Sequence, residues 1–243
     1  MRNNSYFIHF IVIVLIAYSE NQKLDLTDHK SSPVKISTGS WMDLLGYKLE
    51  CPNNGILKNF VLRKNKTQFW YEFQCYSSKQ SGTDTGEPII KCVTFYNYNY
   101  HNKKPTSNIQ TLNNFNANCY VDWGLSAFSL NKEKDSIKVT PVCHALKISS
   151  ASTSSVKTNV KTANSNSIDS LTDIFVGRTD KETNTDIGFP LRGFKIVVDT
   201  TKSTTKPDVY ILYSYTKLRN MEVVRNSYIK QMENFRNKND QID

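Results

Sequence analysis

The chain has 243 residues, a formal net charge of +9, 38% hydrophobic residues and 12% aromatic residues. This length provides for one or two domains with a proper core, and the hydrophobic content excludes wholesale disorder. A positive net charge is compatible with binding to nucleic acid, anionic lipid or acidic glycans. The lysines are spread among asparagines, however, which favours an ordinary solvated surface.

The N-terminal segment has the three parts of a secretory signal peptide, which we expect over residues 1–19. Arg2 precedes an apolar run from Phe7 to Ala17 that only His9 interrupts, and Ala17-Tyr18-Ser19 offers small residues for cleavage. The run has about half of the ~20 apolar residues that a membrane span needs. We therefore expect a secreted or cell-surface protein that does not span a membrane. Residues 20–40 are polar and are interpreted as a loose N-terminal arm.

The next segment contains one cysteine pattern twice. Cys51 to Cys75 and Cys119 to Cys143 both read Cys-x5-Leu-x2-Phe-x-Leu-x12-Cys. Three shared apolar positions at identical offsets indicate an internal repeat. An exported chain meets an oxidising compartment, so the duplicated spacing predicts the disulfides Cys51–Cys75 and Cys119–Cys143. Apolar and aromatic residues alternate within each copy, which is typical of paired β-strands.

Cys92 lies between these two copies and leaves the cysteine count odd. It is either a buried free thiol or a partner in an intermolecular disulfide, and both readings stay open.

A third copy follows without cysteines. Leu191-x2-Phe194-x-Ile196 repeats the apolar core of the first two copies, and alternating tyrosines up to Tyr215 replace the second cysteine. We therefore predict an all-β fold, a β-sandwich-like domain or pair of domains built from three repeats of about 67 residues. The first two repeats occupy residues 41–147, a Ser/Thr/Asn-rich linker or loop occupies 148–171, and the third repeat occupies 172–217.

Residues 218–243 have helical periodicity and form a predicted C-terminal amphipathic helix and tail. Its apolar positions are Leu218, Met221, Val224, Tyr228, Met232 and Phe235. Two interpretations stay open: the apolar stripe packs on the β domain, or it binds a partner or a second copy.

The first copy resembles the repeated unit of dermatopontin-like extracellular proteins. The resemblance rests on Cys51-Pro52 with Gly55, followed by the aromatic run that ends at Cys75. The broader Leu-x2-Phe-x-Leu unit is also similar to repeats in secreted filament and flagellar-hair proteins of protists. The second copy lacks the aromatic signature and the third lacks cysteines. The resemblance implies a matrix, surface or fibre component, with some relatives acting as lectins, and it carries over no catalytic residue.

Motifs for catalysis or metal binding are missing from the sequence. It has no Cys-x2-Cys or His-x3-His spacing, no nucleophile elbow and no phosphate-binding glycine loop. His144 is expected to be an exposed polar residue after a strand. We therefore expect no enzymatic activity, no metal and no cofactor.

Two segments are candidates for surface chemistry. Asn65-Lys66-Thr67 is an N-glycosylation acceptor in a predicted loop. Tyr96, Tyr98 and Tyr100 alternate with asparagine, which suits sugar stacking, a protein interface, or a strand with one buried aromatic face. The sequence thus predicts a secreted structural or interaction protein, a subunit of an extracellular assembly. The alternative is a carbohydrate-binding or cell-recognition module, so the expected partners are protein subunits or glycans, not nucleic acid.

Overall fold

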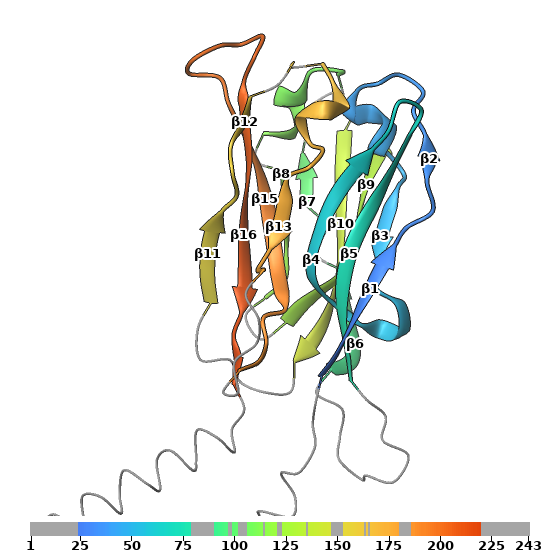
Figure 1. The fold of residues 1–243 in the computed structure, drawn as a ribbon, viewed down its shortest axis with the longest axis vertical. Coiled ribbons are helices and arrows are strands. Elements are labelled where there is room, and N and C mark those ends of the chain that lie inside the picture. Colours follow the sequence, from blue (N-terminus) through green and yellow to red (C-terminus); the bar gives the residue numbers. More distant parts are fainter. Residues whose placement is uncertain are drawn as a thin grey trace, which may run out of the picture.

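The computed structural model of the protein is all-β (Figure 1). It describes residues 24–78, 90–96, 99–101, 106–113, 115–120, 123–134, 136–146, 153–162, 164, 166–179 and 186–219. Within these ranges the helical segments are short 3-10 turns: η1 (Trp41–Leu44), η2 (Pro52–Asn54), η3 (Ile109–Leu112) and η4 (Ile168–Ser170). Strand formation follows the period-two pattern, since buried Ile137 and Val139 alternate with half-buried Ser136, Lys138 and Thr140.

Sheet A, the first of three five-stranded antiparallel sheets, has the order β1-β5-β4-β13, and β2 also pairs with β5. Its strands are β1 (Leu24–Lys30), β2 (Val34–Lys35), β4 (Ile56–Lys64), β5 (Gln68–Ser78) and β13 (Phe175–Gly177). Residues 20–40 were expected to be a loose arm, but residues 24–30 pair with β5 along their whole length. The segment is polar because an edge strand exposes one face and one side to water.

Sheet B has the order β3-β9-β10-β6, and β7 also pairs with β10. Its strands are β3 (Lys48–Glu50), β6 (Ile90–Tyr96), β7 (Asn99–His101), β9 (Trp123–Glu133) and β10 (Ser136–Leu146). Pro141 lies within β10 next to a register shift between Val142 and Cys143, an irregularity that suits a residue with no N–H to donate.

Sheet C has the order β11-β16-β15-β8, and β12 also pairs with β16. Its strands are β8 (Phe115–Asn118), β11 (Thr153–Lys157), β12 (Lys161–Thr162), β15 (Leu191–Asp199) and β16 (Asp208–Thr216). The predicted linker over 148–171 is therefore wrong in part, because β11 and β12 lie inside it. Its serines and threonines suit an edge strand whose outer face is solvated.

A small fourth sheet pairs β14 (Asp186–Gly188) with β17 (Leu218–Arg219). Leu218 is fully buried there, so the predicted helix does not begin at Leu218. Met221, Val224, Tyr228, Met232 and Phe235 lie outside the described residues, as does the predicted signal peptide.

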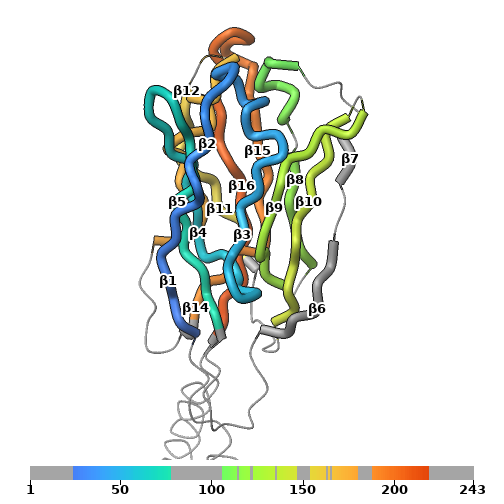
Figure 2. The backbone as a smooth tube through the Cα atoms, turned by 90° about the vertical axis from the view of Figure 1, so that its right-hand side faces the viewer, coloured from blue at the N-terminus to red at the C-terminus, as the bar shows by residue number. Residues whose placement is uncertain are grey.

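The three large sheets have the same construction. Each centres on a hairpin, β4–β5, β9–β10 or β15–β16, whose second strand pairs with two short strands that precede it in the chain. The first strand of each hairpin pairs with a short strand from elsewhere: β4 with β13, β9 with β3, and β15 with β8. Since β3, β8 and β13 each come just before a different hairpin, the sheets are linked in a closed ring. Figure 2 shows one of these links, β3 beside β9.

The core lies where the three hairpins meet. Phe60, Phe128 and Phe194 are in mutual contact, with ring centroids 5.1, 5.2 and 4.8 Å apart. One buried apolar cluster contains residues from all three sheets. A β-sandwich-like domain or pair of domains was expected; in the structure three sheets surround one core, because each contributes an apolar inner face to the same centre.

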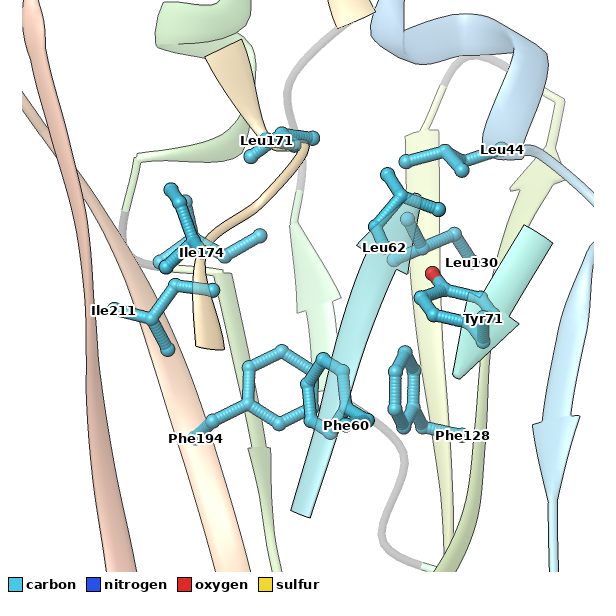
Figure 3. Close-up of a pocket in the computed structure, with 11 residues that line it drawn as sticks. Leu44, Phe60, Leu62, Tyr71, Phe128, Leu130, Leu171, Ile174, Phe194 and Ile211 are labelled. Atoms are coloured by element: carbon cyan, nitrogen blue, oxygen red, sulfur yellow. The ribbon is translucent and has the colours of Figure 1, made fainter. Parts of the chain in front are cut away.

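A cavity of about 40 Å³ lies beside these phenylalanines (Figure 3). Its walls are buried apolar side chains apart from Tyr71, whose hydroxyl is the one polar group that they carry. Burial, followed by the neighbouring Tyr47, raises the pKa of Tyr71. Buried core residues make up the whole wall, so the cavity is a packing feature of the three-sheet junction and not an accessible site.

Short capped turns cover one end of the core. Ser40, Asn108 and Ser167 precede η1, η3 and η4, and each side chain accepts a hydrogen bond from the backbone N–H two residues later. Such caps satisfy N–H groups that the turn itself leaves unpaired. Buried Leu44, Leu112 and Leu171 follow the caps and close the core.

Both predicted disulfides are present. Cys51–Cys75 and Cys119–Cys143 each join Cα atoms 5.8 Å apart, within the usual range. In sheet C, Tyr215 pairs with Leu191 as Cys75 pairs with Leu57. Phe189 packs edge-on against Tyr215 with ring centroids 5.9 Å apart, so an aromatic contact is made at the position that Cys75 occupies in sheet A.

Candidate functional site

An open groove of about 490 Å³ lies on sheet A and is lined by residues of β1, β4, β5 and β13. The four strands lie side by side in Figure 1, with β1 and β13 at opposite edges. The groove is lined by Asp28, His29, Asn59, Val61, Arg63, Glu72, Phe73, Gln74, Phe175 and Thr179. Volumes of this size are typical of small-ligand sites.

A row of hydrogen bonds crosses three strands in the groove. Asn59 Nδ2 donates to Gln74 Oε1 at 2.6 Å, and Gln74 Nε2 donates to Asp28 Oδ1 at 2.7 Å. The row orients two amides and a carboxylate before any ligand arrives. Asn59 is buried, so this end of the row is held firmly by its surroundings.

A second polar row runs beside the first. Arg63 Nε donates to Glu72 Oε2 at 3.0 Å, and Arg63 Nη1 donates to Asp173 Oδ1 at 2.7 Å. Trp70 Nε1 donates to the other Glu72 oxygen at 3.1 Å. The hydrogen bonds from Trp70 and Arg63 lower the pKa of Glu72, and those to Asp173 and Glu72 raise the pKa of Arg63. Both groups are therefore charged at neutral pH.

Aromatic rings flank these rows. Phe175, on β13, is 37% exposed, and Lys30 Nζ lies 4.4 Å from the centre of the Trp70 ring. His29 stacks on Phe73 with ring centroids 5.3 Å apart. The neighbouring Gly177 has φ +126°, and an added Cβ would lie 2.5 Å from Asn59 Cβ, so a glycine is needed for β13 to approach β4.

The same positions on sheets B and C carry different chemistry. Where Asn59 pairs with Gln74 on sheet A, Ala127 pairs with Val142 on sheet B and Gly193 with Ser214 on sheet C. The cross-strand pair of amides thus belongs to sheet A.

No family model, curated protein or solved structure matches the chain. The site must therefore be judged from its own chemistry. The groove offers paired hydrogen-bonding groups, balanced charges and ring faces, which suit non-covalent recognition. Among the described residues no group of three or more His, Cys, Asp or Glu is arranged to hold a metal ion. None of the helical segments in the described ranges is long and apolar enough to cross a membrane.

The predicted site residues are not part of this groove. Cys92 and Tyr96 lie in β6 and Tyr100 lies in β7, but the structure does not describe their side chains. Tyr98 lies outside the described residues. Asn65 is exposed in the turn between β4 and β5, where its Oδ1 accepts hydrogen bonds from the N–H of Thr67 and Gln68 at 2.9 and 2.8 Å.

His144 was expected to be exposed, but it is buried at 3% exposure. It occupies the position of Tyr76 in sheet A, directly after the second cysteine of the disulfide. Within the described part of the chain its Nδ1 has no hydrogen-bond partner. Burial lowers the pKa of His144, while Glu50 acts in the opposite direction.

The groove residues were not predicted from the sequence because they come from segments that are far apart in the chain. Asn59, Glu72 and Gln74 could have been placed on an outer face from the alternation within β4 and β5. Asp28 and Phe175 could not, since one lies in the supposed loose arm and the other arrives through the β13–β4 pairing.

Proposed function

We propose that this chain is a secreted, non-enzymatic interaction protein that binds its partner through the sheet A groove. One observation carries the proposal: sheet A has two adjacent polar rows fixed by their own hydrogen bonds, and one of them, Asn59–Gln74–Asp28, crosses three strands. Preorganised groups lose little freedom when they bind, which favours recognition. The predicted signal peptide and the two disulfides support an extracellular setting.

The proposal includes three copies of one structural unit. The equal construction of the three sheets, the matching cysteine pairs and the contact of Phe60, Phe128 and Phe194 support it. Such a scaffold leaves three outer faces that can diverge while the core stays common. This organisation suits a subunit of an extracellular assembly, as the resemblance to dermatopontin-like and filament-type repeats implies.

Affinity purification of the tagged protein from its native source tests the assembly function. Wild type is expected to retain partners that an Arg63→Ala/Glu72→Ala variant loses, because that change removes the charged row. Asn131→Ala/Thr140→Ala changes two outer-face positions of sheet B and is the matched control. Equal recovery with all three proteins would contradict binding through the groove.

A subunit contact through Cys92 or the residues of the predicted C-terminal helix belongs to the same proposal. Non-reducing electrophoresis and gel filtration of the secreted protein should show a covalent or stable oligomer. Cys92→Ser should abolish a covalent species, and removal of residues 220–243 should abolish a non-covalent one. A strict monomer in all three forms would exclude self-assembly.

Carbohydrate binding is the second candidate, and the groove favours it specifically. Amides and carboxylates in a row can pair with neighbouring hydroxyls, while an exposed ring such as Phe175 can cover the apolar face of a sugar. A glycan array should then give hits that Gln74→Ala weakens and Val142→Ala, its sheet B counterpart, leaves intact. Loss on replacing Tyr96, Tyr98 and Tyr100 instead would move the site to the tyrosine run.

Asn65 is the proposed glycan acceptor. Its exposed position at a hairpin tip keeps the amide nitrogen accessible, and the Thr67 hydroxyl lies 3.4 Å from its Oδ1. The secreted protein should lose mass on treatment with an N-glycosidase. Asn65→Gln and Thr67→Ala should abolish this loss, and Thr67→Ser should retain it. No change of mass in the wild type would exclude the modification.

A further inference from the structure

The outer face of sheet C carries cations in a cross-strand row. Lys195 pairs with Leu212, and Leu212 pairs with Lys157, so the three residues lie side by side on β15, β16 and β11. Their neighbours Phe194, Ile196 and Ile211 point into the core, which places Lys195 and Leu212 on the outer face. Adjacent strands are about 4.8 Å apart, so the two lysine backbones are separated by roughly 10 Å.

Arg192 lies three residues before Lys195 on β15, so it adds a cation along the strand, beside this row. Its Nε donates a hydrogen bond to Ser214 Oγ at 3.2 Å, and Ser214 follows Leu212 on the outer face of β16. Lys157 Nζ lies 3.8 Å from the centre of the Tyr210 ring, on the same face. We call Lys157, Arg192 and Lys195 the cationic face.

Within the described ranges, the ion pairs do not include the three residues of the cationic face. On the other sheets some strand cations are paired, Arg63 with Glu72 and Asp173, and Lys138 with Glu133. Among the described ion pairs none contains Lys157, Arg192 or Lys195. Three cations held together without counter-charges favour an anionic partner.

The acids nearest along these strands lie at one end of the hairpin. Asp199 and Asp208 pair across β15 and β16, where Lys202 and Thr162 bind Asp208. Asp199 is four residues from Lys195, about 13 Å along a strand, which exceeds the ~8 Å screening length at physiological salt. Lys157 does help to lower the pKa of Asp208, after the larger effects of Thr162 and Lys202.

We propose that the cationic face binds a sulfated polysaccharide chain, independently of the sheet A groove. Sulfate groups stay charged at any physiological pH and recur along the polymer, so one chain lying across β15, β16 and β11 meets successive cations. The setting indicated by two disulfides offers this class of polyanion rather than nucleic acid. A membrane surface fits less well, because Leu212 is the single large apolar side chain exposed within the row.

Heparin binding of the full secreted chain, measured at 50 to 200 mM NaCl, tests the proposal. With three ionic contacts the wild-type affinity should fall about 40-fold across that range, by the counterion-release rule. Lys157→Gln/Arg192→Gln/Lys195→Gln should remove most of this dependence. Lys35→Gln/Lys132→Gln/Lys134→Gln removes three exposed cations elsewhere and should bind like wild type.

Controls for folding, for charge and for competing ligands complete the experiment. Thermal melting checks that both triple variants fold, and Lys195→Arg, which keeps the charge, should retain binding whatever the triple variant does. Unsulfated dextran should not bind. Equal loss in both triple variants would show a net-charge effect and overturn the proposal. Tighter binding to phosphatidylserine vesicles or to duplex DNA than to heparin would also overturn it.

Discussion

Sheets A and C differ in how the second strand of the hairpin is held to the chain segment that precedes the first strand. In sheet A the segment before β4 is tied to β5 by the Cys51–Cys75 disulfide. In sheet C the position of Cys75 is held by Tyr215, which packs against Phe189, and Arg178 lies over both rings, 4.5 and 5.0 Å from their centres. The hairpins nevertheless share their register and their core phenylalanine. The difference teaches that a hairpin of this register, with its core phenylalanine, forms with or without a disulfide beside it.

Removal of a shared core ring should have the largest effect, since it affects all three sheets at once. Phe128→Ala leaves Phe60 and Phe194 without their common neighbour. Such truncations cost about 3–5 kcal/mol. Urea denaturation should show this loss of unfolding free energy. A loss below about 1 kcal/mol would mean that the three sheets do not depend on one core.

Loss of one disulfide should be the next largest effect. For a cross-link between residues 24 apart, the chain-entropy model gives about 3 kcal/mol. Cys51→Ala/Cys75→Ala should lower the unfolding free energy by roughly this amount while circular dichroism keeps the native β spectrum. If the variant does not fold at all, the disulfide specifies sheet A and the comparison with sheet C fails.

A smaller effect is expected in the cysteine-free sheet. Arg178 Nη1 donates to the Tyr215 hydroxyl at 2.9 Å. Tyr215→Phe removes this bond but keeps the ring contact with Phe189, and should cost about 1 kcal/mol. Tyr210→Phe, an exchange on the opposite face of the same strand, is the control and should be nearly neutral. Equal costs would contradict a fastening role for Tyr215.

The smallest effect concerns sheet B and depends on pH. Because burial lowers the pKa of His144, the folded protein keeps it neutral while the unfolded chain binds a proton near pH 6.5. Stability should therefore decrease as the pH falls below about 6.5, until the folded-state pKa is reached. Denaturation midpoints between pH 7.5 and 5 should show this slope, and His144→Gln should reduce it. An unchanged slope would assign the effect to other groups.

The parts of the fold that local patterns encode were predictable. Repeated apolar spacing located the three hairpins, and the duplicated cysteine interval identified both disulfides. The outer strands were not predictable in this way. Residues 24–30 and 153–157 are polar, and they become strands because β5 and β16 offer unpaired backbone groups. Backbone pairing with a neighbouring strand therefore determined the secondary structure of these two segments more than their own composition did.

The candidate groove was predictable only in part, for the same reason. Its central residues alternate with core residues on β4 and β5, but the residues at its two edges arrive from other segments. The pairing of Phe175 with Val61 joins positions more than a hundred residues apart, so no local sequence pattern predicts it. Likewise, His144 was expected to be an exposed residue after a strand, but it lies within β10 and is buried.

The exchange of β3, β8 and β13 among the sheets has a consequence for folding. A chain stopped after β10 would lack β13, so the edge of β4 would be open, while β8 would have no β15 to join. Sheet B has all of its strands once β10 is made, but sheet A still needs β13 and sheet C still needs the last hairpin, and most pairings connect distant parts of the sequence. Folding of this topology is thus expected to be slow and all-or-none. An unfinished chain would expose strand edges that could capture the same strands from another molecule.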